Sequence, residues 1–302
     1  MNFAEKLRHN GQLVESKLEE LLNDVNRTGA PERLVAAMRH GMLGGGKRLR
    51  PFLVIESAAL FDVPSERTLA CAVAVELVHG YSLIHDDLPA MDDDQLRRGK
   101  PTVWAAFDEW TAILAGDALQ ALAFQVLADT AISGNCDGLS AITLTRELAA
   151  ASGAAGMVGG QAIDLESEKL SIPATPNVDH VTNLQAMKTG RLIRFSCEAG
   201  AVLAGHTGPE RAALRQFGEH LGVAFQIADD LLDAEGDAER VGKAVAKDTE
   251  AGKATLVSLM GIDAAREALT RALNQAKAEL KMFGKRAETL IAAAEFVASR
   301  DH

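Results

Sequence analysis

The chain is poor in the residues that cross-link small domains or build sheets. Its 302 residues include three cysteines and one tyrosine, and aromatic residues make up only 4%. Cys71, Cys136 and Cys197 are odd in number, far apart and set in apolar helical patterns. We therefore expect buried thiols in a reducing compartment, with neither disulfides nor metal-ligand spacing. Alternating β-branched and aromatic runs between tight turns are nearly absent, which argues against a β fold.

A basic excess and a membrane segment are also missing from the pattern. The net charge of −11 argues against a nucleic-acid-binding protein, which would need a basic face. No apolar run approaches the length that we expect of a membrane span, and the early Glu5 interrupts any signal-peptide core. Hydrophobic residues at 47% and charged residues at 24% are typical of a soluble globular protein. We expect a cytoplasmic protein with no membrane span.

Proline is confined to parts of the chain. None of the eight prolines falls between 102 and 172 or between 210 and 302. Both stretches are rich in Ala and Leu, with apolar residues recurring every three or four positions, which is typical of helices. The sequence predicts an all-α protein, a single domain over 1–302 formed by an antiparallel bundle of ten or more helices. We expect helices over 1–28, 32–43, 51–60, 66–88, 103–131 and 153–168, loops over 167–178 and 235–253, and amphipathic helix over 254–302.

Five aspartates lie within nine residues at the end of a predicted helix. Carboxylates at the C-terminal end of a helix are unfavourable, because that end already carries partial negative charge and like charges repel one another. A cation should therefore sit among them, and Mg²⁺ prefers hard oxygen ligands together with substrate phosphates. Asp86 and Asp92 would not share a helical face, but Pro89 ends the regular helix. The chain can then return and bring Asp92 beside Asp86.

A second aspartate cluster follows near residue 230. Asp229 and Asp233 are four residues apart and share one helical face. One such run alone is more typical of a solvated surface. Two runs, each at the end of an apolar helix and each joined by Arg or Lys, favour a site for Mg²⁺ and diphosphate.

The segment 41–48 is rich in glycine and is followed by basic residues. It matches the first seven positions of a nucleotide-binding P-loop, but Arg48 occupies the position that needs Ser or Thr, and no strand precedes it. The glycines allow close backbone approach, and Lys47, Arg48 and Arg50 supply charge for an anion. A simple helix-ending loop would explain the glycines, but it would not explain three neighbouring cations.

Taken together, the two aspartate-rich motifs resemble those of the trans-isoprenyl diphosphate synthases. The two-residue insertion in the first motif, 86–92, is similar to that of bacterial farnesyl diphosphate synthases. The resemblance runs from the glycine loop at 44–51 to the closing residues 296–300. It implies helices around a central cavity, about three Mg²⁺ ions, a homodimer, and head-to-tail condensation of isopentenyl diphosphate with an allylic diphosphate.

The resemblance also assigns roles to individual residues. Without it, a lone His on a helix and a Lys beside a Thr are more typical of structural and surface positions. The implied metal ligands are Asp86, Asp92, Asp229 and Asp233. The implied contacts for isopentenyl diphosphate are Lys47, Arg50, His79 and Arg98. Those for the allylic substrate are Arg97, Lys188, Thr189, Gln226, Lys243 and Lys253, of which Arg97, Lys188 and Lys243 would support the departing diphosphate. A further polar pair, Gln161 and Asp164, is implied to face the cavity.

Product length is predicted from the helix that ends at Asp86. Ser82, four residues earlier, shares the face of Asp86 and borders the path of the growing chain. Tyr81 is turned further round and offers a bulky ring as the floor. A small residue beside one aromatic residue indicates room for a chain of intermediate length, and the resemblance implies a fifteen-carbon product. The alternatives are a geranyl or geranylgeranyl diphosphate synthase, or a non-catalytic partner subunit, which should carry damaged metal motifs. A terpene cyclase would not need the glycine loop.

Overall fold

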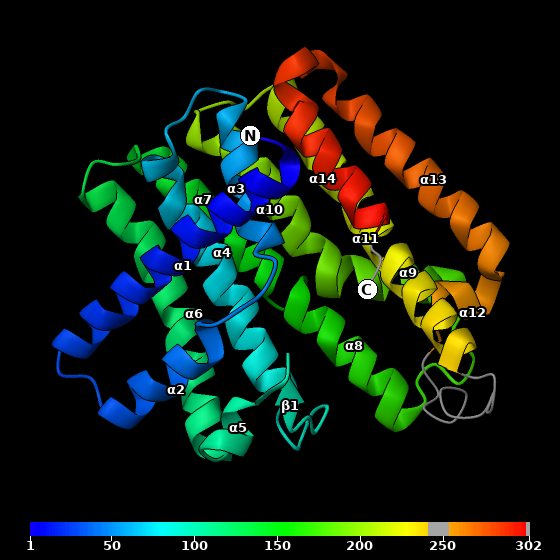
Figure 1. Cartoon of the computed structure of the whole chain (residues 1–302), viewed down its shortest axis with the longest axis horizontal. Helices are drawn as coiled ribbons and strands as arrows, with labels where there is room; N and C mark the ends of the chain where they lie inside the picture. The colour runs from blue at the N-terminus through cyan, green and yellow to red at the C-terminus, as the bar shows by residue number, and fades with distance from the viewer. Residues whose placement is uncertain (241–253, 300–302) are drawn as a thin grey trace. The chain divides into compact units, whose positions relative to one another are not determined.

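The computed structural model describes residues 1–240, with the backbone alone for 235–240, and 254–299 (Figure 1). Within these residues it contains fourteen α-helices, a π-helix, a 3₁₀-helix and one pair of two-residue strands, so the all-α prediction is confirmed. The elements are α1 (Phe3–Arg27), α2 (Glu32–Met42), α3 (Leu49–Ala59), α4 (Ser65–Asp86), β1 (Leu96–Arg97), β2 (Lys100–Pro101), α5 (Val103–Ala106), α6 (Glu109–Ile132), α7 (Gly138–Ser152), α8 (Met157–Leu170), α9 (Val178–Gln185), η1 (Ala186–Gly190), α10 (Arg191–Leu203), α11 (Pro209–Arg240), α12 (Leu256–Met260), α13 (Ile262–Glu279), η2 (Leu280–Ala287) and α14 (Glu288–Ala298).

The chain forms two compact units. Unit 1 comprises Met1–Arg146 and Val202–Gly205, and unit 2 comprises Glu147–Ala201 and His206–His302. The first aspartate motif and the glycine loop belong to unit 1, and the second aspartate motif belongs to unit 2. The assignment of the whole chain to a single domain stays a prediction.

Unit 1 is organised around α4. This helix packs against α3 and α6, and its apolar residues are buried on nearly all sides. Such a helix is hydrophobic nearly all round, because neighbouring helices cover most of its surface. Gly116 of α6 lets the two helices approach closely, since a Cβ there would lie 2.1 Å from the His85 ring.

Two helices of unit 1 depart from the expectation that no apolar run approaches membrane length. Over an 18-residue window the mean hydropathy is 1.3 in α4 and 1.4 in α6, so each is long and apolar enough to span a membrane. The structure buries 67% of the α4 window and 50% of the α6 window. The high hydropathy of α4 and α6 is therefore that of helices that pack against each other in the core.

The helix expected over 103–131 is broken near its start. The structure has α5, then an interruption at Phe107, and then α6. Asp108 begins α6 by accepting a hydrogen bond from the backbone N–H of Thr111, at 2.8 Å. An aspartate in this position is a favourable N-cap, because it satisfies one of the unpaired amides of the first turn.

Unit 2 is organised around α11, which packs against η1, α13 and α14. The helix continues to Arg240 and so includes residues 235–240, which we expected to begin a loop. The expected helix over 153–168 begins later, at Met157, and ends at Leu170. The expected helix over 254–302 is interrupted at Gly261 and Gly284, both with positive φ. One apolar cluster fastens α11 to its neighbours and consists of Val181, Ile227, Leu231, Leu256, Val257 and Ala265.

Candidate active site

The first aspartate motif folds back on itself at the end of α4. The backbone N–H of Met91 donates to the carbonyl of Leu88, and that of Asp92 donates to the carbonyl of Asp86 at 2.9 Å. The return of the chain after Pro89 is thereby confirmed. Asp86 is half-buried and Asp92 is exposed, so the motif leaves its first and last aspartates at the surface end of α4.

The second residue of this motif faces inward instead. Asp87 is 3% exposed. Its Oδ1 atom accepts from Nε of Arg97 at 2.7 Å and lies 2.7 Å from Nη2 of the same guanidinium in an ion pair. Burial raises the pKa of Asp87, and the Arg97 guanidinium opposes that rise. Because the carboxylate contacts two nitrogens of one guanidinium, it fixes both the position and the orientation of the guanidinium. Asp87 therefore positions Arg97.

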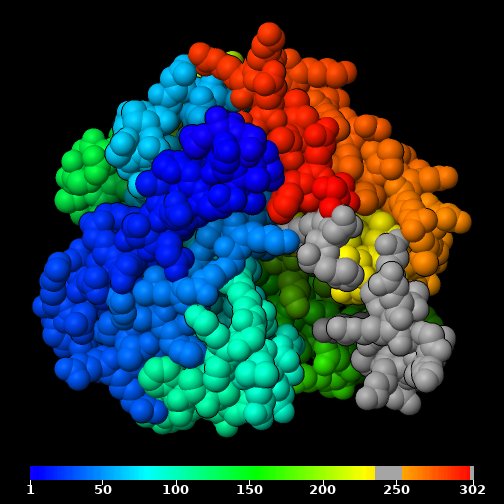
Figure 2. Space-filling model, in the orientation of Figure 1, coloured from blue at the N-terminus to red at the C-terminus, as the bar shows by residue number. Residues whose placement is uncertain are grey.

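Arg97 and Arg98 lie on a small hairpin. Leu96 pairs with Pro101 and Arg97 pairs with Lys100 in the antiparallel strands β1 and β2. This segment, teal in Figure 2, lies at the surface of unit 1 beside the blue N-terminal helices. Arg98 donates through Nη1 to the carbonyl of Gly45, which joins the hairpin to the glycine loop.

The glycine loop has a backbone that only glycine adopts easily. Gly44, Gly45 and Gly46 have φ values of 98°, 143° and 119°. A side chain is rarely tolerated at such angles, and glycine is the residue without this penalty. The loop therefore requires these glycines for its conformation, apart from any ligand.

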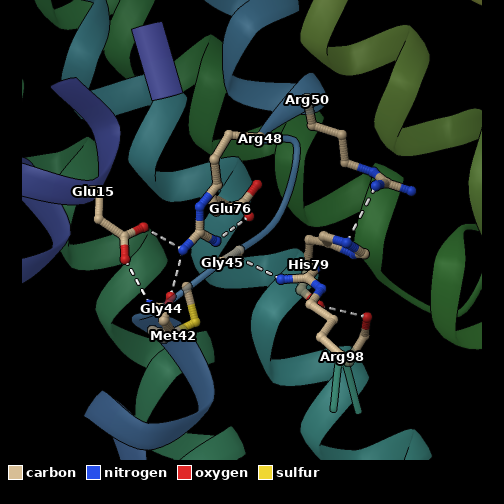
Figure 3. A network of polar contacts seen from close by, with 10 residues as sticks. Glu15, Met42, Gly44, Gly45, Arg48, Arg50, Glu76, His79 and Arg98 are labelled. Atoms are coloured by element: carbon tan, nitrogen blue, oxygen red, sulfur yellow. Dashed lines mark hydrogen bonds and ion pairs between the residues drawn. The ribbon is translucent and has the colours of Figure 1, made fainter. Parts of the chain in front are cut away.

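The prediction that Arg48 supplies charge for a bound anion is wrong. Its side chain turns inward, where Nη1 donates to Glu76 at 2.5 Å and Nη2 donates to Glu15 at 2.6 Å (Figure 3). Nη2 also donates to the carbonyl of Met42. Burial acts to lower the pKa of Arg48, but the carboxylates of Glu76 and Glu15 more than offset it and raise the pKa. Arg48 is a structural ion-pair partner, and Lys47 beside it is exposed.

His79 lies beside the arginines of unit 1 and is itself neutral. Its Nε2 atom lies 3.3 Å from Nη1 of Arg50. Because a guanidinium can only donate, this nitrogen of His79 must be the acceptor and cannot carry a proton. Burial lowers the pKa of His79 well below its usual value, and the nearby Arg50 and Arg98 lower it further. The structure thus brings together three of the four residues predicted for isopentenyl diphosphate, namely Arg50, His79 and Arg98.

In unit 2, Lys188 and Thr189 lie in the π-helix η1. Single π-turns often occur at functional sites, because the widened turn changes the direction of the side chains that follow. The Nζ atom of Lys188 donates to Asp164 of α8 at 2.7 Å. Gly160 allows α8 and the backbone of η1 to pack closely, since a Cβ there would lie 2.3 Å from the backbone nitrogen of Lys188. Close helix packing thus explains this glycine of α8.

The second aspartate motif, like the first, has two outer aspartates and one buried aspartate. Asp229 is half-buried and Asp233 is exposed on α11, while Asp230 is 9% exposed. Asp230 accepts from the backbone N–H of Leu256 at 2.9 Å and from Nε2 of Gln185 at 3.1 Å. Burial raises the pKa of Asp230, and these hydrogen bonds oppose the rise. Asp230 therefore fastens α11 to α9 and α12.

Unit 2 also contains a buried amide and a cavity that bear on the predicted residues Gln161 and Gln226. The amide of Gln161 is buried, and neither its nitrogen nor its oxygen has a hydrogen-bond partner among the described residues. A cavity of about 360 Å³ borders Gln226 and is lined mainly by apolar side chains, with Arg191, Arg194 and Glu219 as its charged members. Thr189 and Lys188 do not line this cavity.

The donor set is compatible with Mg²⁺ that is shared with a phosphate ligand. In the part of the chain that the structure describes, no three side chains of His, Cys, Asp or Glu gather closely enough to hold a metal. Mg²⁺ is usually bound by one or two carboxylates together with substrate phosphates, rather than by an all-protein cage. Asp86 and Asp92 in unit 1, and Asp229 and Asp233 in unit 2, are half-buried or exposed carboxylates whose chemistry fits this kind of binding. Lys243 and Lys253 lie outside the described residues.

Comparisons with known proteins find similar sequences and structures over most of the chain. A sequence profile of the polyprenyl synthetase family matches residues 31–290. The chain is 43% identical to the farnesyl diphosphate synthase of Escherichia coli over 272 residues, or 89% of each chain. It is 38% identical to the farnesyl diphosphate synthase of Geobacillus stearothermophilus, over 100% of this chain and 99% of that protein. A crystal structure of an FPP/GFPP synthase from Zymomonas mobilis superposes with a TM-score of 0.78 and 42% identity, covering 95% of this chain and 99% of the other.

Proposed function

Because the chain belongs to the polyprenyl synthetase family, we propose that it is a prenyltransferase that makes farnesyl diphosphate. The reaction is the head-to-tail condensation of isopentenyl diphosphate with dimethylallyl diphosphate and then with geranyl diphosphate. The observation that carries the proposal is the folded-back first motif, which leaves Asp86 and Asp92 together at the end of α4. In the same unit Arg97 is anchored nearby on Asp87.

The allylic diphosphate is bound through cations and Mg²⁺. We assign the metal ligands to Asp86, Asp92, Asp229 and Asp233, with three ions in total. Bound Mg²⁺ neutralises negative charge that builds on the diphosphate as it leaves. Arg97, Lys188 and Lys243 support the same departing group, and Thr189, Gln226 and Lys253 complete the contacts with the allylic substrate. Asp87 and Asp164 hold Arg97 and Lys188 in place.

Isopentenyl diphosphate is bound by Lys47, Arg50, His79 and Arg98. Neutral His79 adds no charge of its own, but it holds Arg50 through the Nε2 contact. The burial of Arg98 and its closeness to Arg48 lower the pKa of Arg98. Crowded cations of this kind are stabilised by an anion, which the diphosphate of this substrate supplies.

The chemical step breaks one bond and forms another. The allylic carbon–oxygen bond breaks, and its electron pair leaves with diphosphate. The double bond of isopentenyl diphosphate then attacks the allylic cation and forms a carbon–carbon bond. A proton is lost from the adjacent carbon to restore a double bond. No described side chain is placed as a general base, and the released diphosphate is a suitable acceptor. Water must be excluded from the cation throughout this step.

Turnover of the purified protein with dimethylallyl diphosphate, isopentenyl diphosphate and Mg²⁺ tests the proposal. After dephosphorylation, gas chromatography should show farnesol as the main product. Geraniol or geranylgeraniol as the main product would favour a different chain length, and the FPP/GFPP relative shows why length must be measured. A non-catalytic partner subunit would give no turnover by itself, but both aspartate motifs are intact in this chain.

We place the protein in the cytoplasm as a homodimer. Its three cysteines are free and buried, as in a reducing compartment. Large apolar side chains are exposed at the start of α6 and again from its end into α7, and we take these exposed groups as support for self-association. The exposed residues are Trp110, Ile113, Leu114, Ile132, Leu139 and Ile142. Light scattering after size exclusion should give the mass of two chains.

A further inference from the structure

Glu15 of α1 is joined to the glycine loop by both oxygens of its carboxylate. Oε1 accepts from the backbone N–H of Gly44 at 2.7 Å, and Oε2 accepts from Nη2 of Arg48 at 2.6 Å (Figure 3). The contacts span 29 and 33 residues of sequence, so they fasten α1 to the loop. Neither the aspartate motifs nor the basic residues of the loop pointed to this glutamate.

The loop needs ties of this kind. Gly44, Gly45 and Gly46 follow one another with positive φ, and glycine loses more backbone freedom on ordering than any other residue. Three contacts oppose that loss in the structure. Glu15 holds the Gly44 amide, Arg98 holds the Gly45 carbonyl, and Arg48 holds the Met42 carbonyl.

Glu15 can be removed without opening the buried ion pair beneath it. Arg48 meets Glu76 through Nη1, whereas it meets Glu15 through Nη2. The side chains of Arg48 and Glu76 are each 5% exposed, and that of Glu15 is 35% exposed. Loss of Glu15 therefore leaves the buried pair and the Met42 contact in place. Its main consequence is a free Gly44 amide and a looser loop.

We propose that Glu15 is a positioning residue for the isopentenyl diphosphate site. By fixing Gly44, it sets the direction in which the loop presents Lys47 to a diphosphate, and it keeps Arg98 in its contact with Gly45. This role rests on the proposed function of the loop as a diphosphate site. A positioning role and a purely electrostatic role of Glu15 predict opposite changes in anion affinity when Glu15 is removed.

Charge and position act in opposite directions here. Removing a carboxylate from a cluster of cations makes the cluster more positive, so charge alone would tighten the binding of an anion. Removing a tie from the loop would weaken that binding, because the loop must then be ordered when the ligand binds. Glu15→Gln separates these effects, since its amide oxygen can still accept from Gly44 although the charge and the contact with Nη2 of Arg48 are lost.

The primary measurement is calorimetric titration with inorganic pyrophosphate in EDTA. Without divalent metal, the titration reports the cationic residues rather than the aspartates. Glu15→Ala should raise the dissociation constant about tenfold, the size expected when a hydrogen bond in a charged network is lost. Glu15→Gln should restore most of the affinity. Hydrogen exchange of the peptide containing 43–47 should become faster in Glu15→Ala and return toward the parent in Glu15→Gln.

Glu19→Ala is the matched control. Glu19 lies one turn further along α1, is 58% exposed, and pairs with Arg39 of α2 at 3.3 Å. Its removal takes away one charge and one contact between helices, but it spares the loop. It should leave pyrophosphate affinity and exchange at 43–47 unchanged. An equal effect of both alanine variants would mean that Glu15 only docks α1, and the proposal would be wrong.

Turnover measurements add a substrate-specific readout. Glu15→Ala should raise the KM for isopentenyl diphosphate about tenfold and leave the KM for dimethylallyl diphosphate within twofold. Tighter pyrophosphate binding by both Glu15 variants, or unchanged binding and exchange in both, would overturn the proposal. If the parent binds pyrophosphate but makes no prenyl product, the proposed function fails while the role of Glu15 in the loop is still decided by the titration.

Discussion

Asp92 donates its backbone N–H to the carbonyl of Asp86, and the 2.9 Å contact returns the chain to the end of α4. The backbones of these two residues therefore meet, although six positions separate them in the sequence. Asp87, between them, is turned into the protein. The motif thus has two outer carboxylates, those of Asp86 and Asp92, and one inner carboxylate that holds Arg97.

We predict that Asp86→Ala abolishes turnover without unfolding the protein. Metal charge stabilises the leaving diphosphate by several kcal/mol, so the rate should fall at least about a hundredfold. EDTA should have the same effect on the parent, and Mg²⁺ should reverse it. Circular dichroism and product formation are the measurements, and Asp129→Ala, an exposed change on α6, is the control. Near-normal turnover by a folded Asp86→Ala variant would refute the metal assignment.

Asp87→Asn should damage both stability and the allylic site. The Arg97 guanidinium loses its charged partner, and a hydrogen bond to a charged group contributes about 1.5–3 kcal/mol. We expect a lower midpoint in urea and a higher KM for dimethylallyl diphosphate. Asp94→Asn provides the comparison, because Asp94 is 54% exposed and lies 3.7 Å from Arg97. Equal behaviour of the two variants would show that Asp87 does not position Arg97.

Arg50→Ala and Lys188→Ala should affect different substrates. Arg50 belongs to the cationic group with His79, whereas Lys188 lies in η1 and is held by Asp164. Loss of one charged contact should cost about 1.5–3 kcal/mol, or roughly ten- to a hundredfold in the KM of the substrate concerned. Arg50→Ala should raise the KM for isopentenyl diphosphate, and Lys188→Ala that for the allylic diphosphate. A parallel rise of both constants in both variants would contradict two separate sites.

His79 should make folding stability fall as the pH is lowered. Its pKa in the folded protein is well below 6.5, so below pH 6.5 the unfolded chain binds a proton that the folded chain does not. Stability is thus fully present above about pH 6.5 and declines as the pH falls toward the folded pKa, by about 1.4 kcal/mol per pH unit at most. Urea unfolding at pH 7, 6 and 5 measures this slope. His79→Gln should flatten it, and an unchanged slope would exclude His79 as its source.

Product length should respond to two neighbouring residues of α4. Tyr81 is 4% exposed, with its ring 5.8 Å from that of His85, and Ser82 is half-buried. Ser82→Phe should stop growth at ten carbons, and Tyr81→Ala should let chains pass fifteen carbons. Gas chromatography of the dephosphorylated products separates these lengths. If both variants kept the parent's product distribution, α4 would not form the floor.

The boundaries of the early helices were predictable because local signals mark them. The expected helices over 1–28 and 32–43 match α1 and α2 closely, since Pro31 allows a helix to begin but not to continue through it. The interruption at Phe107 was missed because the Ala-rich and Leu-rich pattern continues across it. Asp108 was the available signal, as an aspartate three residues before Thr111 can cap a new helix.

The site was predictable where chemistry is local. Pro89 and the spacing of the aspartates foretold the return of Asp92 to Asp86. The inward turn of Arg48 could not be foretold, because it depends on a left-handed backbone at that residue and on Glu76, which is 28 positions away. The same holds for Glu15, whose partners become neighbours only in the folded protein.

The contact between Gly160 and Lys188 has a consequence for reading mutational scans. The methyl group added in Gly160→Ala would lie 2.3 Å from the backbone nitrogen of Lys188 and would displace η1. A scan that scores activity alone would therefore rank this substitution among the most harmful changes. Gly160 would then look like a catalytic position, although it has no chemical group to offer. Scoring the abundance of folded protein beside activity would identify such false positives, and it would separate the glycines that shape this enzyme from the side chains that act in it.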